Sequence, residues 1–330
     1  MKEDPRTVTV RSPARLHLGF LDLNGSRGRR YGSVGLTLDG LGVSLAATHA
    51  RSLSASGPQA ARAEAFAASL HERFGLPRNC RVEIREAIPE HVGLGSGTQL
   101  AIAVGVALAR FHRLDLGVRE IAALHERGQR SGIGIGAFEA GGFLIDGGKG
   151  ARDEPPPLVA RAEFPPAWRV LLVFDRAARG LHGADEIAAF QKLPAFSEQT
   201  SAHLCRLMLM QALPALQERD LDAFGRAIGE MQRITGDYFA PAQGGRYSSP
   251  RVARTLAWLE SEGVAGIGQS SWGPTGFAIV GTESDARMLA RRAQTRAADA
   301  GALQFMVCGG RNRGGEVEAV EAARAPAAAK

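Results

Sequence analysis

A glycine-rich segment at residues 89–98 (PEHVGLGSGT) is the feature that most restricts how this 330-residue chain can fold. It follows an alternating, strand-like segment (81–88) and precedes an apolar run (99–111) typical of a buried helix. The first turn of a helix leaves backbone N–H groups unpaired at the positive end of the helix dipole, and glycines let a phosphate approach them closely. The segment therefore predicts a phosphate or diphosphate site; the alternative is a turn that merely joins strand to helix. The predicted phosphate-binding residues here are Gly93, Gly95, Ser96, Gly97 and Thr98.

The rest of the chain alternates between strand-like and helix-like segments and predicts an α+β protein. At this length two lobes are expected. Residues 1–157 form the first, with strands near 7–10, 16–23, 34–47, 81–88 and 142–146, and helices at 60–74, 99–111 and 118–128. Residues 149–157, with three prolines, read as a linker, and a kink is expected at Ser12-Pro13.

The second lobe, 158–318, reads as a β-α-β-β-α-β sandwich of the ferredoxin-like kind with extra helices. Its predicted strands are 168–174, 264–269, 276–280 and 303–307, and its helices lie near 184–193, 198–216, 220–236, from 250 onward, and 284–300. The Ala-rich tail, 319–330, is expected to fray.

Charge and composition restrict the partners. The net charge of +6 favours anionic ligands, but basic residues are interspersed with acidic ones and no basic run carries aromatics, which argues against nucleic acid. The longest apolar stretch, 100–111, is too short to span a membrane and contains Gly105 and Arg110. The N-terminus lacks the apolar core of a signal peptide, so we expect a cytoplasmic protein.

The cysteines and histidines give no cofactor signature. Cys80, Cys205 and Cys308 are widely separated, and the eight histidines show no metal-site spacing, so neither disulfides, structural zinc nor haem is expected. The string Gly132-x-Gly134-x-x-Ala137 satisfies a loose dinucleotide pattern, but a predicted helix rather than a strand precedes it, which argues against NAD.

Three motifs, in order and spacing, resemble those of the GHMP kinase superfamily of small-molecule kinases. Residues 89–98 resemble its central phosphate motif, 12–19 (SPARLHLG) its N-terminal motif, and 268–276 (GQSSWGPTG) its C-terminal glycine loop. The resemblance spans nearly the whole chain and implies a two-lobed fold with a ferredoxin-like C-terminal half. Three departures, Gly97, Trp272 and Pro274, stand where the kinases usually keep small or serine residues, which argues against ATP phosphoryl transfer.

Within the superfamily, segments 29–36, 130–148 and 180–187 resemble the β-ribofuranosylaminobenzene 5'-phosphate synthases. That resemblance implies condensation of phosphoribosyl diphosphate with 4-aminobenzoate or 4-hydroxybenzoate. The products are a C-riboside 5'-phosphate, CO2 and diphosphate, early in tetrahydromethanopterin biosynthesis. It also implies a pentosyltransferase that uses Mg2+ or another divalent cation and forms a homodimer.

This chemistry assigns provisional roles to polar residues outside the glycine segment. Arg29 and Arg30 are predicted to clamp phosphate or carboxylate. Asp22 is predicted to bind Mg2+ or stabilise the ribosyl cation, or else to cap the turn before Asn24-Gly25. Glu139 is predicted as catalytic and Asp146 as a metal ligand, with structural ion pairing as the alternative for both.

Three further groups of residues have two interpretations each. Arg15 and His17 alternate on one strand face and are predicted to bind substrate, or to pack. A second anion nest is predicted at Arg130, Ser131 and Gly132, with a structural turn as the alternative. His182 and Glu186, one helical turn apart, favour helix capping and surface pairing over catalysis.

Two rival functions complete the hypotheses: an ATP-dependent kinase of a small alcohol, and a sugar-phosphate-binding protein without catalysis. Phosphoribosyl diphosphate with 4-aminobenzoate distinguishes them, because only the transferase releases CO2 and diphosphate.

Overall fold

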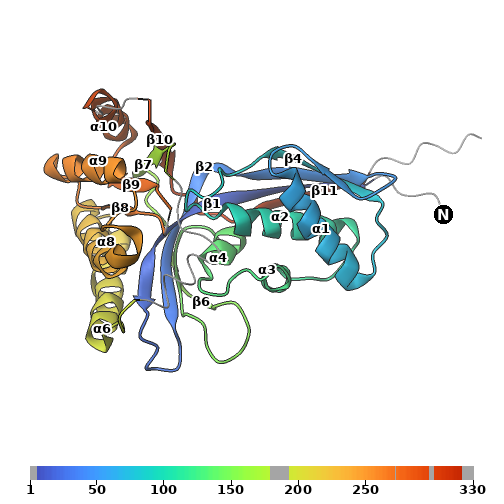
Figure 1. Cartoon of the computed structure of the whole chain (residues 1–330), viewed down its shortest axis with the longest axis horizontal. Helices are drawn as coiled ribbons and strands as arrows, with labels where there is room; N and C mark the ends of the chain where they lie inside the picture. The colour runs from blue at the N-terminus through green and yellow to red at the C-terminus, as the bar shows by residue number, and fades with distance from the viewer. Residues whose placement is uncertain (1–5, 179–192, 272, 297–300, 322–330) are drawn as a thin grey trace, which may run out of the picture.

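The computed structural model describes residues 6–178, 193–271, 273–296 and 301–321. The motif at 180–187, with His182 and Glu186, and nearly all of the predicted helix at 184–193 lie outside the described residues, as does Trp272. The chain has two sheets, one in each lobe. Figure 1 shows the lobes side by side, with the long strands β1 and β2 of the first lobe extending along the second lobe.

The first lobe is built on a hairpin of two long strands, β1 (Arg6–Asp22) and β2 (Tyr31–His49). The sheet order is β11-β1-β2-β4-β3, with β5 (Phe143–Asp146) added on β2 and β6 (Leu158–Ala162) on β5. The short strands β3 (Ser54–Ser56) and β4 (Cys80–Glu86) complete one edge. The kink expected at Ser12-Pro13 is present as a register shift between Pro13 and Arg15, and a second shift separates His17 from Gly19. Such irregularities re-aim side chains.

Four helices belong to this lobe: α1 (Ala60–Phe74), α2 (Ser96–Phe111), α3 (Val118–Leu124) and α4 (Ile133–Glu139). The predicted apolar helix, α2, packs against β1 and β2 of the sheet and is also in contact with α1, α3 and α4, so most of its residues are buried. No helix in the described part of the chain combines the length and the apolarity that crossing a lipid bilayer requires.

The glycine string 132–137, for which no helix was predicted, is mostly helix α4. Its glycines serve close packing: a Cβ on Gly134 would begin 2.8 Å from the Cγ2 atom of Thr98. The absence of side chains therefore lets α4 approach the start of α2. Sequence reasoning missed this helix because glycine normally disfavours a helix interior.

The second lobe has the predicted ferredoxin-like arrangement, a four-stranded antiparallel sheet in the order β10-β7-β9-β8. Its strands are β7 (Arg169–Asp175), β8 (Ile267–Gln269), β9 (Gly276–Val280) and β10 (Leu303–Gly309). Its helices are α6 (Glu198–Leu207), the π-helical turn η1 (Met208–Ala212), α7 (Leu213–Glu218), α8 (Leu221–Gln243), α9 (Pro250–Ser261) and α10 (Glu283–Arg296). Helix α8 contacts both β8 and β1, which places it between the lobes.

The structure differs from the predicted domain division at 157/158 and from the predicted fraying of residues 319–321, whereas residues 322–330 lie outside the described part of the chain. Strand β6 pairs with β5, and β11 (Glu316–Glu321) pairs antiparallel with β1, so both belong to the first sheet. The proline-rich segment before β6 is held by Arg119, whose guanidinium donates to the carbonyls of Pro155 and Pro156. Hydrogen bonding by backbone groups, which composition does not reveal, makes this segment part of the first lobe.

Candidate active site

The glycine segment forms an accessible turn at the N-terminus of α2, as predicted from the sequence. Gly93 and Gly95 have φ of 84° and 85°, a backbone region that favours glycine, and Gly95 is the N-cap without a side-chain cap. Leu94 is buried and anchors the turn, whereas Gly93, Gly95 and residues 96–98 are only half-buried. The amides of the first helical turn, at Ser96, Gly97 and Thr98, have no acceptor within the helix and are available to an anion.

Three guanidinium groups from different elements surround this turn. The Nη1 atom of Arg15, on β1, donates to the Gly93 carbonyl at 2.7 Å, and a Cβ on Gly95 would begin 3.3 Å from the Arg15 Cζ. Two more arginines approach Gly97. If Gly97 carried a Cβ, that atom would lie 2.7 Å from Nη2 of Arg62, on α1, and 3.9 Å from Nη1 of Arg127, which follows α3. The start of α2 therefore faces a concentration of positive charge.

Arg127 and Arg62 repel each other in this arrangement. Burial, followed by the neighbouring Arg62, lowers the pKa of Arg127 below its ordinary value. The Arg127 guanidinium lies over the Phe66 ring at 5.5 Å, and its buried Nε has no hydrogen-bond partner among the described residues. Arg62 is paired with Glu90. A bound anion would offset both the repulsion and the burial cost.

The C-terminal glycine loop contacts this turn directly. The Ser270 hydroxyl donates to the Gly93 carbonyl at 2.8 Å and accepts the His17 amide at 3.1 Å. The Ser271 amide donates to the His17 carbonyl at 3.2 Å. A Cβ added to Gly273 would lie only 2.4 Å from the Gly93 nitrogen, which leaves no room for a side chain. The two glycine loops therefore pack backbone to backbone. Three segments that are separate in sequence thus converge at one place.

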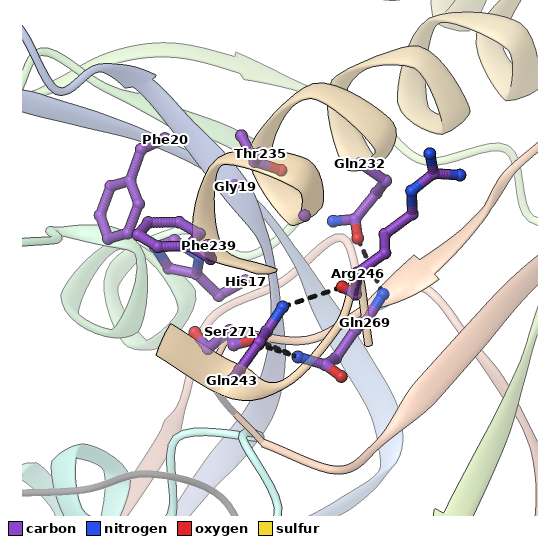
Figure 2. Close-up of a pocket in the computed structure, with 11 residues that line it drawn as sticks. His17, Gly19, Phe20, Gln232, Thr235, Phe239, Gln243, Arg246, Gln269 and Ser271 are labelled. Carbon is purple, nitrogen blue, oxygen red and sulfur yellow. Dashed lines mark hydrogen bonds between the residues drawn. The ribbon is translucent and has the colours of Figure 1, made fainter. Parts of the chain in front are cut away.

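A narrow pocket lies beside this junction, between β1, α8 and the loop at 269–271 (Figure 2). The His17 and Phe20 rings are 4.7 Å apart between centroids, and Phe20 and Phe239 are 6.4 Å apart. On the other side three glutamines are joined by hydrogen bonds. The Gln232 side chain accepts the backbone N–H of Gln269 at 2.8 Å, and the Gln269 side chain donates to the side chain of Gln243 at 3.2 Å. The pocket is aromatic on one wall and polar on the other.

His17 is one of the buried polar residues of this pocket. Both its ring nitrogens lack a hydrogen-bond partner within the described residues, although the side chain is 3% exposed. Burial, then the nearby charges of Arg15 and Arg130, lower its pKa to about 3. His17 is therefore neutral near pH 7 and offers a ligand one donor and one acceptor.

Comparison with known proteins identifies the family. The models of the GHMP kinases N terminal domain and of the GHMP kinases C terminal domain match residues 61–142 and 212–309. The beta-ribofuranosylphenol 5'-phosphate synthase of Archaeoglobus fulgidus is 34% identical, over 94% of this chain and 99% of the relative. The synthase of the same name from Methanothermobacter thermautotrophicus is 32% identical, over 93% and 97%. The chain belongs to the β-ribofuranosylphenol 5'-phosphate synthase family.

Solved structures extend the likeness to the GHMP fold as a whole. The homoserine kinase of Cytophaga hutchinsonii superposes with a TM-score of 0.66 at 15% identity, covering 96% of this chain and 98% of the kinase. The mevalonate diphosphate decarboxylase of Staphylococcus aureus gives 0.63 at 14% identity, covering 95% and 98%. At these identities the likeness concerns the fold alone, and it agrees with the two lobes of this family member.

In this synthase-family chain, Asp22 ends β1 and caps the hairpin turn. Its Oδ1 accepts the amides of Asn24 at 2.8 Å and Gly25 at 3.0 Å, and the Ser201 hydroxyl of α6 at 3.0 Å. This is the turn-capping geometry that the sequence left open as an alternative. The bond to Ser201 also ties the hairpin to the second lobe.

The two neighbouring arginines of the hairpin are bound to backbone carbonyls. Arg29 donates through Nε and Nη2 to the carbonyls of Gly147 and Gly148, each at 2.6 Å. Arg30 donates to the Leu23 carbonyl at 3.2 Å and lies over the Tyr31 ring at 5.6 Å. In this conformation both residues brace the hairpin, and the ligand-clamping role of Arg29 and Arg30 stays a prediction.

The predicted second anion nest holds a carboxylate of the protein itself. The Oδ2 atom of Asp146 accepts the Gly132 amide at 2.7 Å and is 3.4 Å from the Ser131 hydroxyl. Its Oδ1 accepts the amides of Ser33 at 3.0 Å and Gly148 at 2.9 Å. Burial raises the pKa of Asp146, and these bonds oppose that rise. Both oxygens of Asp146 are thus engaged by the start of α4 and by β2.

Glu139 lies away from the glycine turn. It is the last residue of α4 and is exposed, whereas the contact of α4 with Thr98 is made by Gly134. Five residues of helix separate the two, about 7.5 Å along the axis. Arg130, by contrast, does lie near the site, since its charge acts on His17.

Sequence reasoning missed four residues of the site: Arg62, Arg127, Phe20 and Phe239. Arg127 precedes Gly128, which has φ of 83° and ends the α3 segment, and this was the one local signal available. The other three are ordinary members of amphipathic segments.

Proposed function

We propose that this protein catalyses decarboxylating phosphoribosyl transfer from phosphoribosyl diphosphate to a para-substituted benzoate, releasing CO2 and diphosphate, early in tetrahydromethanopterin biosynthesis. The observation that carries the proposal is the open N-terminus of α2 facing Arg15, Arg62 and Arg127. The names of the relatives, which make a ribofuranosylphenol 5'-phosphate, support the same reaction.

The acceptor we propose is 4-hydroxybenzoate, because replacing its carboxylate by a ribosyl group gives a ribosylphenol, the product in the relatives' name. With 4-aminobenzoate the same reaction would give an aminobenzene. Neutral His17 fits a hydroxyl, since its unprotonated ring nitrogen can accept the hydroxyl proton. Phe20 and Phe239 supply apolar faces for the benzene ring.

The proposed steps need no oxidant. The ring carbon that bears the carboxylate attacks C1' of the ribose, and the bond from C1' to the diphosphate oxygen breaks. The carbon–carboxylate bond then breaks, CO2 leaves, and its electron pair restores the aromatic ring. Negative charge accumulates on the departing diphosphate, where the amides of residues 96–98 and the three guanidinium groups lie.

Mg2+ is the cation expected with a diphosphate donor, but Asp146 does not fit as a ligand of a resident ion, because both its oxygens accept backbone N–H groups. Asp22 makes its three hydrogen bonds through Oδ1 alone, so its Oδ2 atom stays a candidate ligand. No step above depends on a metal. A Mg2+ requirement remains a proposal, which removal by EDTA followed by readdition would test.

The pocket must open for the acceptor. Its cavity volume is about 30 Å³, whereas a water molecule alone needs roughly 10–15 Å³ on this measure. A benzene ring therefore requires Phe20 or Phe239 to turn, or α8 to move away from β1. Protein fluorescence or NMR should accordingly report a conformational change when 4-hydroxybenzoate binds.

The test is an assay with phosphoribosyl diphosphate and carboxyl-labelled 4-hydroxybenzoate. We expect labelled CO2 and diphosphate in equal amounts, with 4-aminobenzoate used less efficiently. ADP formation from ATP and a small alcohol, without CO2, would instead support the kinase. Tight binding of phosphoribosyl diphosphate without any turnover would support the binding protein.

A further inference from the structure

A cluster of three metal-ligating side chains lies in the first lobe, away from the candidate active site. His71 comes from α1, Cys80 is the first residue of β4, and His112 is the C-cap of α2. One potential ligand atom from each lies within 4.8 Å of the other two. His71 and Cys80 are buried and His112 is half-buried. It is the one such group of three or more found in the described residues.

The distances within the cluster match a tetrahedral metal. The His71 and His112 Nε2 atoms are 3.2 Å apart, and the Cys80 Sγ lies 3.6 Å from the His71 Nε2. Zinc bond lengths of about 2.05 Å to nitrogen and about 2.3 Å to sulfur give tetrahedral edges of about 3.3 Å between nitrogens and about 3.6 Å between nitrogen and sulfur. The third distance, between the ligand atoms of Cys80 and His112, is within 4.8 Å and is the one that must shorten when a metal binds.

The tautomer of His71 is fixed in the way that metal-binding histidines usually show. Its Nδ1 lies 2.7 Å from the Ala67 carbonyl and must donate to it, because a carbonyl only accepts. In the neutral ring the Nε2 lone pair then faces both Cys80 and His112. Without a metal, the Cys80 thiol and the His112 N–H group would compete for this single lone pair. A cation placed between the Sγ atom and the two Nε2 atoms would accept a lone pair from each of them.

We propose that His71, Cys80 and His112 bind a zinc ion, with the thiol as thiolate and a fourth position left for water. Thiolate and imidazole are the ligands zinc prefers. The ion would fasten α1, β4 and the end of α2 together. Because α2 has 16 residues, the site lies about 24 Å from its N-terminus, so the ion acts on stability and not on the reaction. This inference does not rest on the proposed function, and it reverses the sequence-based expectation of no zinc.

The first experiment is metal analysis of the full chain, purified without a histidine tag after growth with zinc. We expect one zinc per chain, falling to background in Cys80→Ser and His112→Gln. Cys205→Ser and His203→Gln are matched controls, because Cys205 is exposed and His203 pairs with Glu230 on the surface; both should keep the metal. Zinc well below one per chain after reconstitution, or a full complement in Cys80→Ser, would overturn the proposal.

Two further readouts test the site, and the first needs only the wild-type protein. Replacement of zinc by Co2+ in the wild-type protein should give a thiolate-to-cobalt charge-transfer band, and its absence in cobalt-loaded protein would count against Cys80. A chelator should lower the Tm of the wild-type protein and leave that of Cys80→Ser unchanged. Equal Tm shifts in both would show that the chelator acts elsewhere. Turnover of the zinc-free protein, assayed with Mg2+ at moderate temperature, should equal that of the zinc-loaded protein.

Discussion

At the scale of single residues, Arg127 is placed where its charge is unfavourable until a ligand arrives. Its guanidinium is partly buried beside Arg62, which lowers its pKa, and an anion at the start of α2 would reverse that cost. We expect Arg127→Gln to reduce kcat/KM for phosphoribosyl diphosphate about 10- to 100-fold, the equivalent of one charged hydrogen bond. The Tm of the ligand-free protein should stay the same or rise.

Arg292→Gln is the control for this variant, because Arg292 makes a surface pair with Glu262 on the far side of the second lobe. It should leave kcat/KM unchanged. A parallel loss of Tm and activity in Arg127→Gln would mean that Arg127 is structural.

A substitution at Asp146 provides a second test at this scale, because it distinguishes a metal-binding role of this carboxylate from a structural one. Asn in its place keeps one acceptor oxygen, so a buried amide such as that of Gly132 loses its partner, at a cost of about 1–3 kcal/mol. We expect Asp146→Asn to lower the free energy of unfolding by that amount, measured by urea titration. The Mg2+ concentration giving half-maximal activity should not change; an increase of tenfold or more would restore the metal-ligand hypothesis.

At the scale of elements, the shape of the α2 N-terminus depends on Gly95, whose φ of 85° disfavours any side chain. Ala there costs about 1–2 kcal/mol of strain and brings a Cβ to within 3.3 Å of Arg15. We expect Gly95→Ala to lower Tm moderately and to raise the Kd for diphosphate at least tenfold, measured by calorimetry.

Gly75→Ala separates strain from function. Gly75 caps α1 with φ of 60° and has nothing within 4 Å of an added Cβ, so this variant carries similar strain away from the site. It should lose comparable stability and bind diphosphate normally. If both variants bound equally well, the turn at Gly95 would not be the anion site.

Local patterns explain why some elements could be predicted and others could not. The glycine turn, the buried helix α2 and the order of the second lobe follow from contiguous residues. The pocket does not, because Phe20 and Phe239 meet only after the lobes pack. Arg62 and Arg127 are two among 40 basic residues. The predicted anion nest at Gly132 does bind a carboxylate, but this carboxylate is that of Asp146. Local sequence did not reveal the pairing, because Asp146 lies fourteen residues later in the chain.

At the scale of the whole molecule, two buried imidazoles make stability depend on pH. Burial lowers the pKa of His17 to about 3 and that of His125 to about 4. The unfolded chain takes up these protons near pH 6.5, whereas the folded chain does not, so the free energy of unfolding falls as pH drops below 6.5. Each imidazole contributes at most about 1.4 kcal/mol per pH unit.

Urea unfolding at several values between pH 7.5 and pH 5 would measure this slope. His17→Gln should make this slope shallower, whatever the stability of the variant at pH 7. Identical slopes in the wild-type protein and His17→Gln would show that His17 titrates normally in the folded state.

The pairing of Arg6 with Glu321 in β1 and β11 closes the first sheet with the latest described residues of the chain. During synthesis the edge of β1 that pairs with β11 therefore stays unpaired until the second lobe has been made. Cutting the gene between the lobes should therefore yield an insoluble first fragment. Joining Glu321 to Arg6 by a short linker and opening a loop elsewhere should give a circular permutant that still folds.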